Sequence, residues 1–321
     1  ERMPDYSKID VPILSSGNWG GVGLHPRGNT EGYLNSASKQ KWLEIHGLEH
    51  FTHFYTEYGI DLQKRFFGYF LKGEDNGWDK QPSVQLLVRH PGEVFVKRSE
   101  EAWPIPRTNW TELYLDTAGK MLVDKLKTES EDITYQALGD GITFLAPPVE
   151  KETEITGPVS AKLFISSETK DADIFLVLRV FTSDMKEIVF KGANDPHTPV
   201  GLGWLRASHR KLDEKMSLPY RPYHTHDEVQ FLIPNEIYEL DIEIWPTSIV
   251  LPEGYRLGLS VRGRDYVWPG YEEGMPEIAG RIMYGVGPFK HEIKGNRPLE
   301  TYDGKVTLYS GPEHPSNILL P

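Results

Sequence analysis

The chain has 321 residues, long enough for about two domains, so a small disulfide-stabilised fold is excluded. Hydrophobic residues make up 38% of the sequence, and with the 30 glycines they place it among globular proteins and exclude a disordered chain. The 47 acidic residues outnumber the 35 basic residues, and the resulting net charge of −12 disfavours nucleic acid and an anionic membrane surface as partners.

The sequence contains no cysteine, which excludes disulfide bonds, thiolate metal ligands and a cysteine nucleophile. This composition fits a reducing compartment and favours the cytoplasm. No apolar run approaches the roughly 18 residues of a membrane span, and the N-terminus lacks the basic region of a signal peptide. Because the sequence begins at Glu1 without an initiator methionine, we expect a processed or cut piece of a longer protein.

The first 50 residues predict a small parallel sheet. Ile9–Ser16 is a mainly apolar run that leads into a glycine-rich loop, and Gly28–Lys39 has the polar start and small residues of a short helix. Lys41–Ile45 then predicts a second strand. The order strand, helix, strand is typical of a parallel α/β sheet.

A longer helix is predicted over Tyr55–Lys72, where aromatic and aliphatic side chains recur at helical spacing. Gly73 provides a plausible end for this helix. We interpret the aromatic stripe as core packing.

After this helix the sequence changes to short β-rich segments separated by Gly, Pro and Asp. These segments are Val84–Val88, Leu113–Leu115, Ala161–Ile165, Ile174–Phe181, Glu239–Ile244, Arg256–Val261 and Lys305–Tyr309. Many short strands without helices between them predict a β-sandwich of jelly-roll type. The polar stretch Asp116–Gly141 is predicted to be a surface loop.

No complete catalytic motif is present in the sequence: GxSxG, HExxH, a P-loop and a GxGxxG after a strand are all absent. Histidine is the candidate catalytic residue, because His46, His50 and His53 follow a predicted strand at spacings of four and three. Three such histidines could bind zinc from one helix face, although Gly47 weakens that helix and no carboxylate completes the set. A single histidine acting as general base for a serine fits the segment better, and a structural histidine is the third alternative.

Three other groups of polar residues have competing interpretations. His224 and His226, in an HxHxE pattern, suggest a cupin-like metal site, but the surrounding prolines favour a surface segment. Asp171 and Asp173, two acids at the start of a strand, fit a turn. The three basic residues Arg206, His209 and Arg210 could bind an anion or pair with local carboxylates. No cofactor is implied by any of these groups.

A linked series of motifs resembles the CocE/NonD hydrolases, the family of cocaine esterase and X-prolyl dipeptidyl aminopeptidases. The N-terminal motifs are VPILSSGNWGG, GLHPRGNTEGY, KWLEIHGLEH, QKRFFGYFLKGEDNGW and QPSVQLLVRHPG. The resemblance continues through ITGPVSAKLFISS, DADIFLVLRVF, GWLRASHRKLD, DIEIWPTSIVLPEGYRLGLSV, RGRDY and SGPEHPSNILLP. It covers nearly the whole chain.

This resemblance implies two domains. Residues 1–80 resemble the C-terminal part of an α/β-hydrolase catalytic domain, and residues 81–321 resemble a complete jelly-roll β-sandwich of the galactose-binding-like fold. On this template the strand with the nucleophile, the oxyanion-hole tyrosine and the helical cap all lie upstream of the chain. The resemblance therefore implies an upstream catalytic segment of the same protein as a partner.

The resemblance also implies one site residue. The family's triad histidine ends a segment like GPWSH, which matches HGLEH and falls on His50. The family's aspartate, in GGWYDG, matches SGNWGG and falls on Gly20. An imidazole without an acid partner has neither its tautomer nor its orientation fixed, and another acid is needed in that role.

Our leading hypothesis is the C-terminal portion of a serine hydrolase that cleaves acyl ester or amide bonds, X-Pro peptide bonds among them. His50 would act as general base and then general acid, and small-molecule esters, amides or peptides would be the substrates. The jelly roll would form one side of the active site and would take part in the contacts between subunits of a homo-oligomer. The alternative hypothesis is a non-catalytic β-sandwich module that binds a carbohydrate or a peptide.

Overall fold

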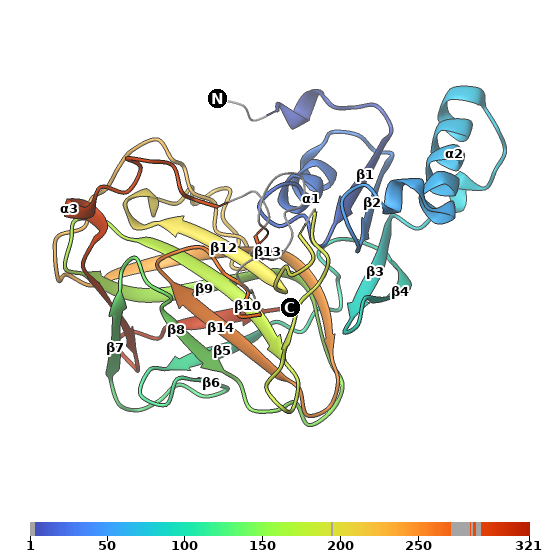
Figure 1. The fold of residues 1–321 in the computed structure, drawn as a ribbon. Helices are drawn as coiled ribbons and strands as arrows, with labels where there is room; N and C mark the ends of the chain where they lie inside the picture. Colours follow the sequence, from blue (N-terminus) through green and yellow to red (C-terminus); the bar gives the residue numbers. More distant parts are fainter. Residues whose placement is uncertain (1–3, 194, 271–282, 284, 287–289) are drawn as a thin grey trace.

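The computed structural model describes residues 4–193, 195–270, 283, 285–286 and 290–321. The protein is mainly β, with a four-stranded sheet near the N-terminus and a 12-stranded sheet that contains the other strands of the described residues (Figure 1). The predicted mainly β architecture is confirmed. Within the described ranges, no helix is long and apolar enough to cross a membrane.

The four-stranded sheet has the order β1 (Ile13–Asn18), β2 (Lys41–His46), β3 (Val84–His90) and β4 (Val94–Glu100). Strands β1 and β2 are parallel, as predicted. The assignment of the strand at Val84–Val88 to the β-sandwich is wrong, because β3 pairs in parallel with β2. A helical crossover connects β2 to β3 and returns the chain in the same direction, which a hairpin cannot do.

The two long helices cover opposite faces of this sheet. Side chains alternate along β2, so that Leu43 packs in one core with Tyr33 of α1 (Pro26–Asn35). Trp42 points the other way and packs against Phe66 of α2 (Glu57–Lys72). Helix α2 ends as predicted, at Gly73, whose φ of 68° is readily adopted by glycine. The shorter helices are η1 (Tyr6–Lys8), η2 (His53–Tyr55), η3 (Trp78–Lys80), η4 (Ala207–His209) and α3 (Leu299–Tyr302).

The larger sheet closes on itself. Its strand order is β13-β12-β10-β14-β8-β6-β5-β16-β9-β15-β7, and β9 also pairs with β13, which joins distant parts of that order into a ring. The strands are β5 (Thr111–Asp116), β6 (Met121–Val123), β7 (Glu131–Gln136), β8 (Ile142–Leu145), β9 (Thr153–Ser167), β10 (Asp173–Phe181), β11 (Glu187–Ile188), β12 (Gly201–Arg206), β13 (Tyr238–Leu251), β14 (Arg256–Arg262), β15 (Lys305–Ser310) and β16 (Asn317–Leu320). Side chains such as Leu163, Leu176 and Leu259 fill the enclosed core.

The expectation of a surface loop over Asp116–Gly141 is wrong in part, because β6 and β7 lie within it. Strand β7 pairs with β15, and its Tyr135 is buried in the main core, with Ile133 packed against that core. The two apolar side chains alternate with acidic and polar ones, as in a strand with one solvent-facing side. The many charged residues of Asp116–Gly141 made this short alternation of apolar and polar side chains hard to recognise in the sequence.

Arg89 of β3 connects the two sheets. Its side chain is 1% exposed, and its guanidinium donates to Ser248 O at 2.7 Å, Val200 O at 2.8 Å and Thr247 Oγ1 at 3.0 Å. The guanidinium carbon also lies 4.2 Å from the ring centroid of Phe190. The guanidinium of Arg89, on a strand of the four-stranded sheet, thus donates hydrogen bonds to buried acceptors of the 12-stranded sheet.

We expect Arg89→Ala to destabilise the protein by about 3 kcal/mol or more, because it leaves several buried acceptors without donors. Equilibrium unfolding in urea measures the change in the free energy of unfolding. The matched control Lys80→Ala removes an exposed cation and should change it by less than about 0.5 kcal/mol. Equal stability of Arg89→Ala and the control would show that the two sheets do not depend on this contact.

Candidate functional site

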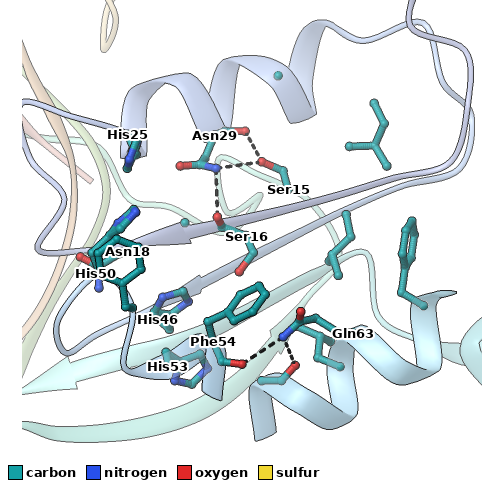
Figure 2. Close-up of a pocket in the computed structure, with 18 of the residues that line it drawn as sticks. Ser15, Ser16, Asn18, His25, Asn29, His46, His50, His53, Phe54 and Gln63 are labelled. Atoms are coloured by element: carbon teal, nitrogen blue, oxygen red, sulfur yellow. Dashed lines mark hydrogen bonds between the residues drawn. The ribbon is translucent and has the colours of Figure 1, made fainter. Parts of the chain in front are cut away.

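A cavity of about 880 Å³ lies along the edge of β1, between α1 and α2. Its lining includes His25, His46, His50 and His53, together with the apolar side chains of α2. Figure 2 shows Asn18, His25 and His50 at one end of the cavity, with His46 and His53 nearby. The three histidines noted in the sequence therefore line one cavity, but they do not form one cluster.

His50 follows β2 and is held from both sides. Its backbone N–H donates to Ala193 O at 2.9 Å, and its ring stacks on the ring of His25 with centroids 4.6 Å apart. Partial burial lowers the pKa of His50 below its usual value, and the nearby His25 and His46 lower it further. At neutral pH the imidazole is therefore uncharged and able to accept a proton.

Asn18, the last residue of β1, fixes the turn that leads to His50. Its side-chain amide donates to Gly47 O at 3.0 Å and to Leu48 O at 2.7 Å, and the side chain is buried. Leu48 has a φ of 65°, an uncommon conformation for a leucine. These two hydrogen bonds stabilise the uncommon turn. Sequence reasoning missed Asn18, because a lone asparagine at the end of a strand carries no motif.

No acid partner of His50 is found in the described part of the chain. Its Nδ1 is buried without a hydrogen-bond partner there, and so is the Oδ1 atom of Asn18. A Cβ atom at Gly20 would lie 2.5 Å from Gly192 Cα and 2.6 Å from Lys191 O. The backbone of the larger sheet's loop therefore occupies the space that an aspartate side chain would need at this position.

His46 and His53 belong to a second cluster with a buried carboxylate. Glu44 is 1% exposed and its Oε2 atom lies 2.9 Å from His46 Nδ1, while its Oε1 atom lies 3.8 Å from His53 Nε2. The two imidazole rings stack with centroids 4.1 Å apart. The expectation that no carboxylate completes a histidine set is wrong, since the strand places Glu44 on the same face as His46.

The other sequence candidates have structural partners. His226 Nδ1 lies 3.3 Å from His209 Nδ1, while the acid of the HxHxE pattern, Glu228, contacts Gln230 and Lys211 instead. Burial, with the charge of His226 next, lowers the pKa of His224 to about 4. In the described residues, the metal-ligand geometry is met by Glu44, His46 and His53 and not by this pattern.

The two aspartates and the neighbouring arginines hold loops together. Asp171 is buried and accepts hydrogen bonds from Ser208 and Tyr302. Asp173 pairs with Arg206 at 2.8 Å and with Arg297 at 2.6 Å, and both arginines lower the pKa of Asp173 against the effect of burial. For Arg206, pairing with a local carboxylate is the alternative that the structure supports. The guanidinium of Arg210 lies against the backbone carbonyls of Ala207 and Gln230.

Comparisons with known proteins agree over most of the chain. Cocaine esterase of a Rhodococcus species is 26% identical over 302 residues, which are 81% of this chain and 45% of that protein. A putative serine esterase of Mycobacterium bovis is 26% identical over 239 residues, covering 63% of this chain and 35% of that protein. The chain thus spans between about a third and about half of the length of these curated relatives.

Solved structures share the fold. A CocE/NonD family hydrolase from Staphylococcus aureus is 29% identical with a TM-score of 0.88, and the match covers 99% of this chain and 55% of that one. An alpha-amino acid ester hydrolase, 16% identical with a TM-score of 0.65 over 98% of this chain and 56% of that one, shows the fold alone.

Residues 76–319 match the family described as the X-Pro dipeptidyl-peptidase C-terminal non-catalytic domain. This match covers most of the β strands and begins shortly before β3. The chain belongs to this family, and over nearly its whole length it is the C-terminal portion of a CocE/NonD hydrolase fold.

Proposed function

We propose that the chain is the C-terminal portion of a serine hydrolase that cleaves acyl ester or amide bonds, and that its substrates include X-Pro peptides. The observation that carries the proposal is His50, an uncharged imidazole in a cavity at the C-terminal end of the parallel strands β1 and β2. Catalytic groups in open α/β sheets lie at this end of the strands. The esterase names of the relatives support the reaction class.

In this proposal the serine comes from a segment outside the chain. His50 takes the proton of the serine hydroxyl as the hydroxyl oxygen attacks the carbonyl, and it then gives the proton to the leaving alcohol or amine. Asn18 is a positioning residue, because its two hydrogen bonds hold the turn before His50. An acid for His50 Nδ1 would also come from outside the described residues.

Replacing His50 with Ala in the complete protein should lower kcat/KM for an ester substrate by roughly three powers of ten or more, as loss of a triad member does. Steady-state hydrolysis of a chromogenic ester measures this loss, and circular dichroism checks that the fold is retained. The matched control His90→Ala, at the end of β3, should leave kcat/KM within about twofold. Full activity without His50 would reject its role and favour the binding-module alternative.

The pH dependence of kcat/KM should report the lowered pKa of His50. A general base must be uncharged, so activity falls on the acid side as its imidazole gains a proton. Because burial and the neighbouring histidines lower this pKa, the acid limb should lie below the ordinary histidine value of about 6.5. An acid limb above that value would contradict this prediction and show that the acid supplied from outside the described residues raises the pKa of His50 by more than burial and the neighbouring histidines lower it.

We also propose that the cavity along β1 accepts a neighbouring strand of the upstream segment. The backbone N–H groups of Ile13 and Trp19 donate to Gln40 O and His46 O, so the odd-numbered residues of this parallel strand face β2. The even-numbered residues Leu14 and Ser16 therefore direct their N–H groups toward the open edge. An unpaired edge with apolar surroundings favours strand addition.

Hydrogen exchange can test this strand addition. The amides of Leu14 and Ser16 should exchange at least about tenfold more slowly in the complete protein than in the chain alone, because pairing protects them. The Leu43 amide, which donates to Ser83 O at 2.9 Å, is the internal control and should be protected in both. Equal exchange of the edge amides in the two proteins would show that no strand pairs with β1.

The domain division stays a proposal: residues 1–80 as the end of an α/β-hydrolase domain and residues 81–321 as a jelly-roll domain of the galactose-binding-like type. The start of the family match at residue 76 supports this division. The pairing of β3 with β2 and of β4 with β3 favours a structural boundary nearer the end of β4, at Glu100.

A second candidate function is the non-catalytic module that binds a carbohydrate or peptide. It is favoured by the family's non-catalytic description and by a second cavity of about 600 Å³ over β10, β12 and β13. Trp204 and Trp245 line this cavity with their rings at 86° to each other, beside Arg27 and Glu243. Aromatic faces next to charged hydrogen-bonding groups suit a polar ring such as a sugar.

A further inference from the structure

The strongest site outside the proposed hydrolytic centre is the cluster of Glu44, His46 and His53. Glu44 and His46 are two residues apart on β2 and therefore share the face toward α2, while His53 comes from the short helix η2. One ligand atom from each residue lies within 4.8 Å of the others. The exposed fractions are 1%, 7% and 6%, so all three residues are more than nine-tenths buried.

Each member of the cluster has a buried electron-pair donor without a partner. The atoms Glu44 Oε1, His46 Nε2 and His53 Nε2 have no hydrogen-bond partner among the residues that the structure describes. A buried polar atom without a hydrogen-bond partner destabilises the folded state, so three together require an explanation. A bound cation would satisfy all three at once.

The surroundings of Glu44 orient these donors. Ser16 Oγ–H donates to Glu44 Oε2 at 2.6 Å, and His46 Nδ1 lies 2.9 Å from the same oxygen. If Nδ1 carries the proton and donates it to the carboxylate, the lone pair of His46 lies on Nε2. A carboxylate contact on one ring nitrogen commonly orients a histidine whose other nitrogen binds a metal.

We propose that Glu44 Oε1, His46 Nε2 and His53 Nε2 bind a divalent transition-metal ion of the zinc type. Two histidines and one glutamate form a known zinc ligand set that leaves a fourth position open. Bonds of about 2.0–2.1 Å separate tetrahedral ligands by roughly 3.4 Å, and Glu44 Oε1 and His53 Nε2 are already 3.8 Å apart. Imidazole ligands also favour such an ion over calcium or magnesium.

Binding requires one ring to turn. The planes of His46 and His53 differ by only 16°, and an ion bound through a ring nitrogen lies near the plane of that ring. His46 is fixed on a strand by its contact with Glu44, whereas His53 lies on a three-residue helix. The ring of His53 is therefore the one that turns, and this rearrangement makes His53 the informative residue to change.

The test is a titration of the chelator-treated chain with Co²⁺ and Zn²⁺. We expect one Co²⁺ per chain with the visible absorption of a four-coordinate site, displacement of Co²⁺ by Zn²⁺, and a higher Tm with Zn²⁺. The variant His53→Gln should weaken binding by more than about tenfold, in line with losses at metal sites. The control His90→Gln should bind as the wild type does.

The outcomes separate this site from an adventitious one. Absence of stoichiometric Co²⁺ uptake, or unchanged binding by His53→Gln, would overturn the proposal. Loss of binding in His226→Gln with retention in His53→Gln would assign the ion to the more exposed His209–His226 pair, which would also overturn it. If His53→Gln does not fold, X-ray absorption of the zinc-loaded His226→Gln chain decides: two imidazoles support the proposal, and fewer contradict it.

Discussion

The close approach of Gly20 to the segment Lys191–Ala193 is the contact on which the candidate hydrolytic site depends. Ala193 N donates to Gly20 O at 3.0 Å, and Ala193 O accepts the hydrogen bond of His50 N–H at 2.9 Å. A loop of the larger sheet therefore holds the backbone of His50 in place. The same approach leaves no room for a Cβ atom at Gly20. The backbone position of His50 and the exclusion of a side chain at Gly20 thus depend on the same contact.

Among the described residues, the edge of β1 that faces away from β2 has no paired strand. The cavity beside it is bordered by large apolar side chains that face solvent, with exposed fractions of 70% for Phe51, 54% for Phe54 and 51% for Phe67. Clusters of this kind mark surfaces that bind other polypeptide segments. In contrast, at the junction between the two sheets the buried guanidinium of Arg89 donates hydrogen bonds to Ser248 O and Val200 O. In the described part of the chain, hydrogen bonds therefore join the two sheets, whereas apolar side chains are exposed where the proposed catalytic partner would bind.

Patterns within a single element were predictable from the sequence, and contacts between elements were not. Helical spacing located α2 and its end at Gly73, and an apolar run located β2. The partner of β3 was missed because its residues fit either a sandwich or a parallel sheet, and only the preceding crossover decides. His50 was found through its resemblance to a family motif, and its role stays a prediction. Asn18 and Glu44 act through contacts with residues about 30 positions away, which no local pattern reports.

The burial of Glu44 separates the two groups of histidines. A carboxylate that is 1% exposed needs compensation for its lost hydration, and its contacts are one hydroxyl and two imidazoles. The hydroxyl and the imidazoles offer hydrogen-bonding groups to this carboxylate, and a bound cation would in addition compensate its charge. An ion that binds the folded chain more tightly than the unfolded one would stabilise it by about 2.7 kcal/mol at a free concentration 100 times its Kd. His50 carries no charge that a cation would have to compensate, because its imidazole is uncharged at neutral pH and lies near two other histidines. A cation would thus stabilise the cluster around Glu44, whereas a positive charge on His50 would be unfavourable. The cluster is therefore suited to hold an ion, and the imidazole of His50 is suited to accept a proton only transiently.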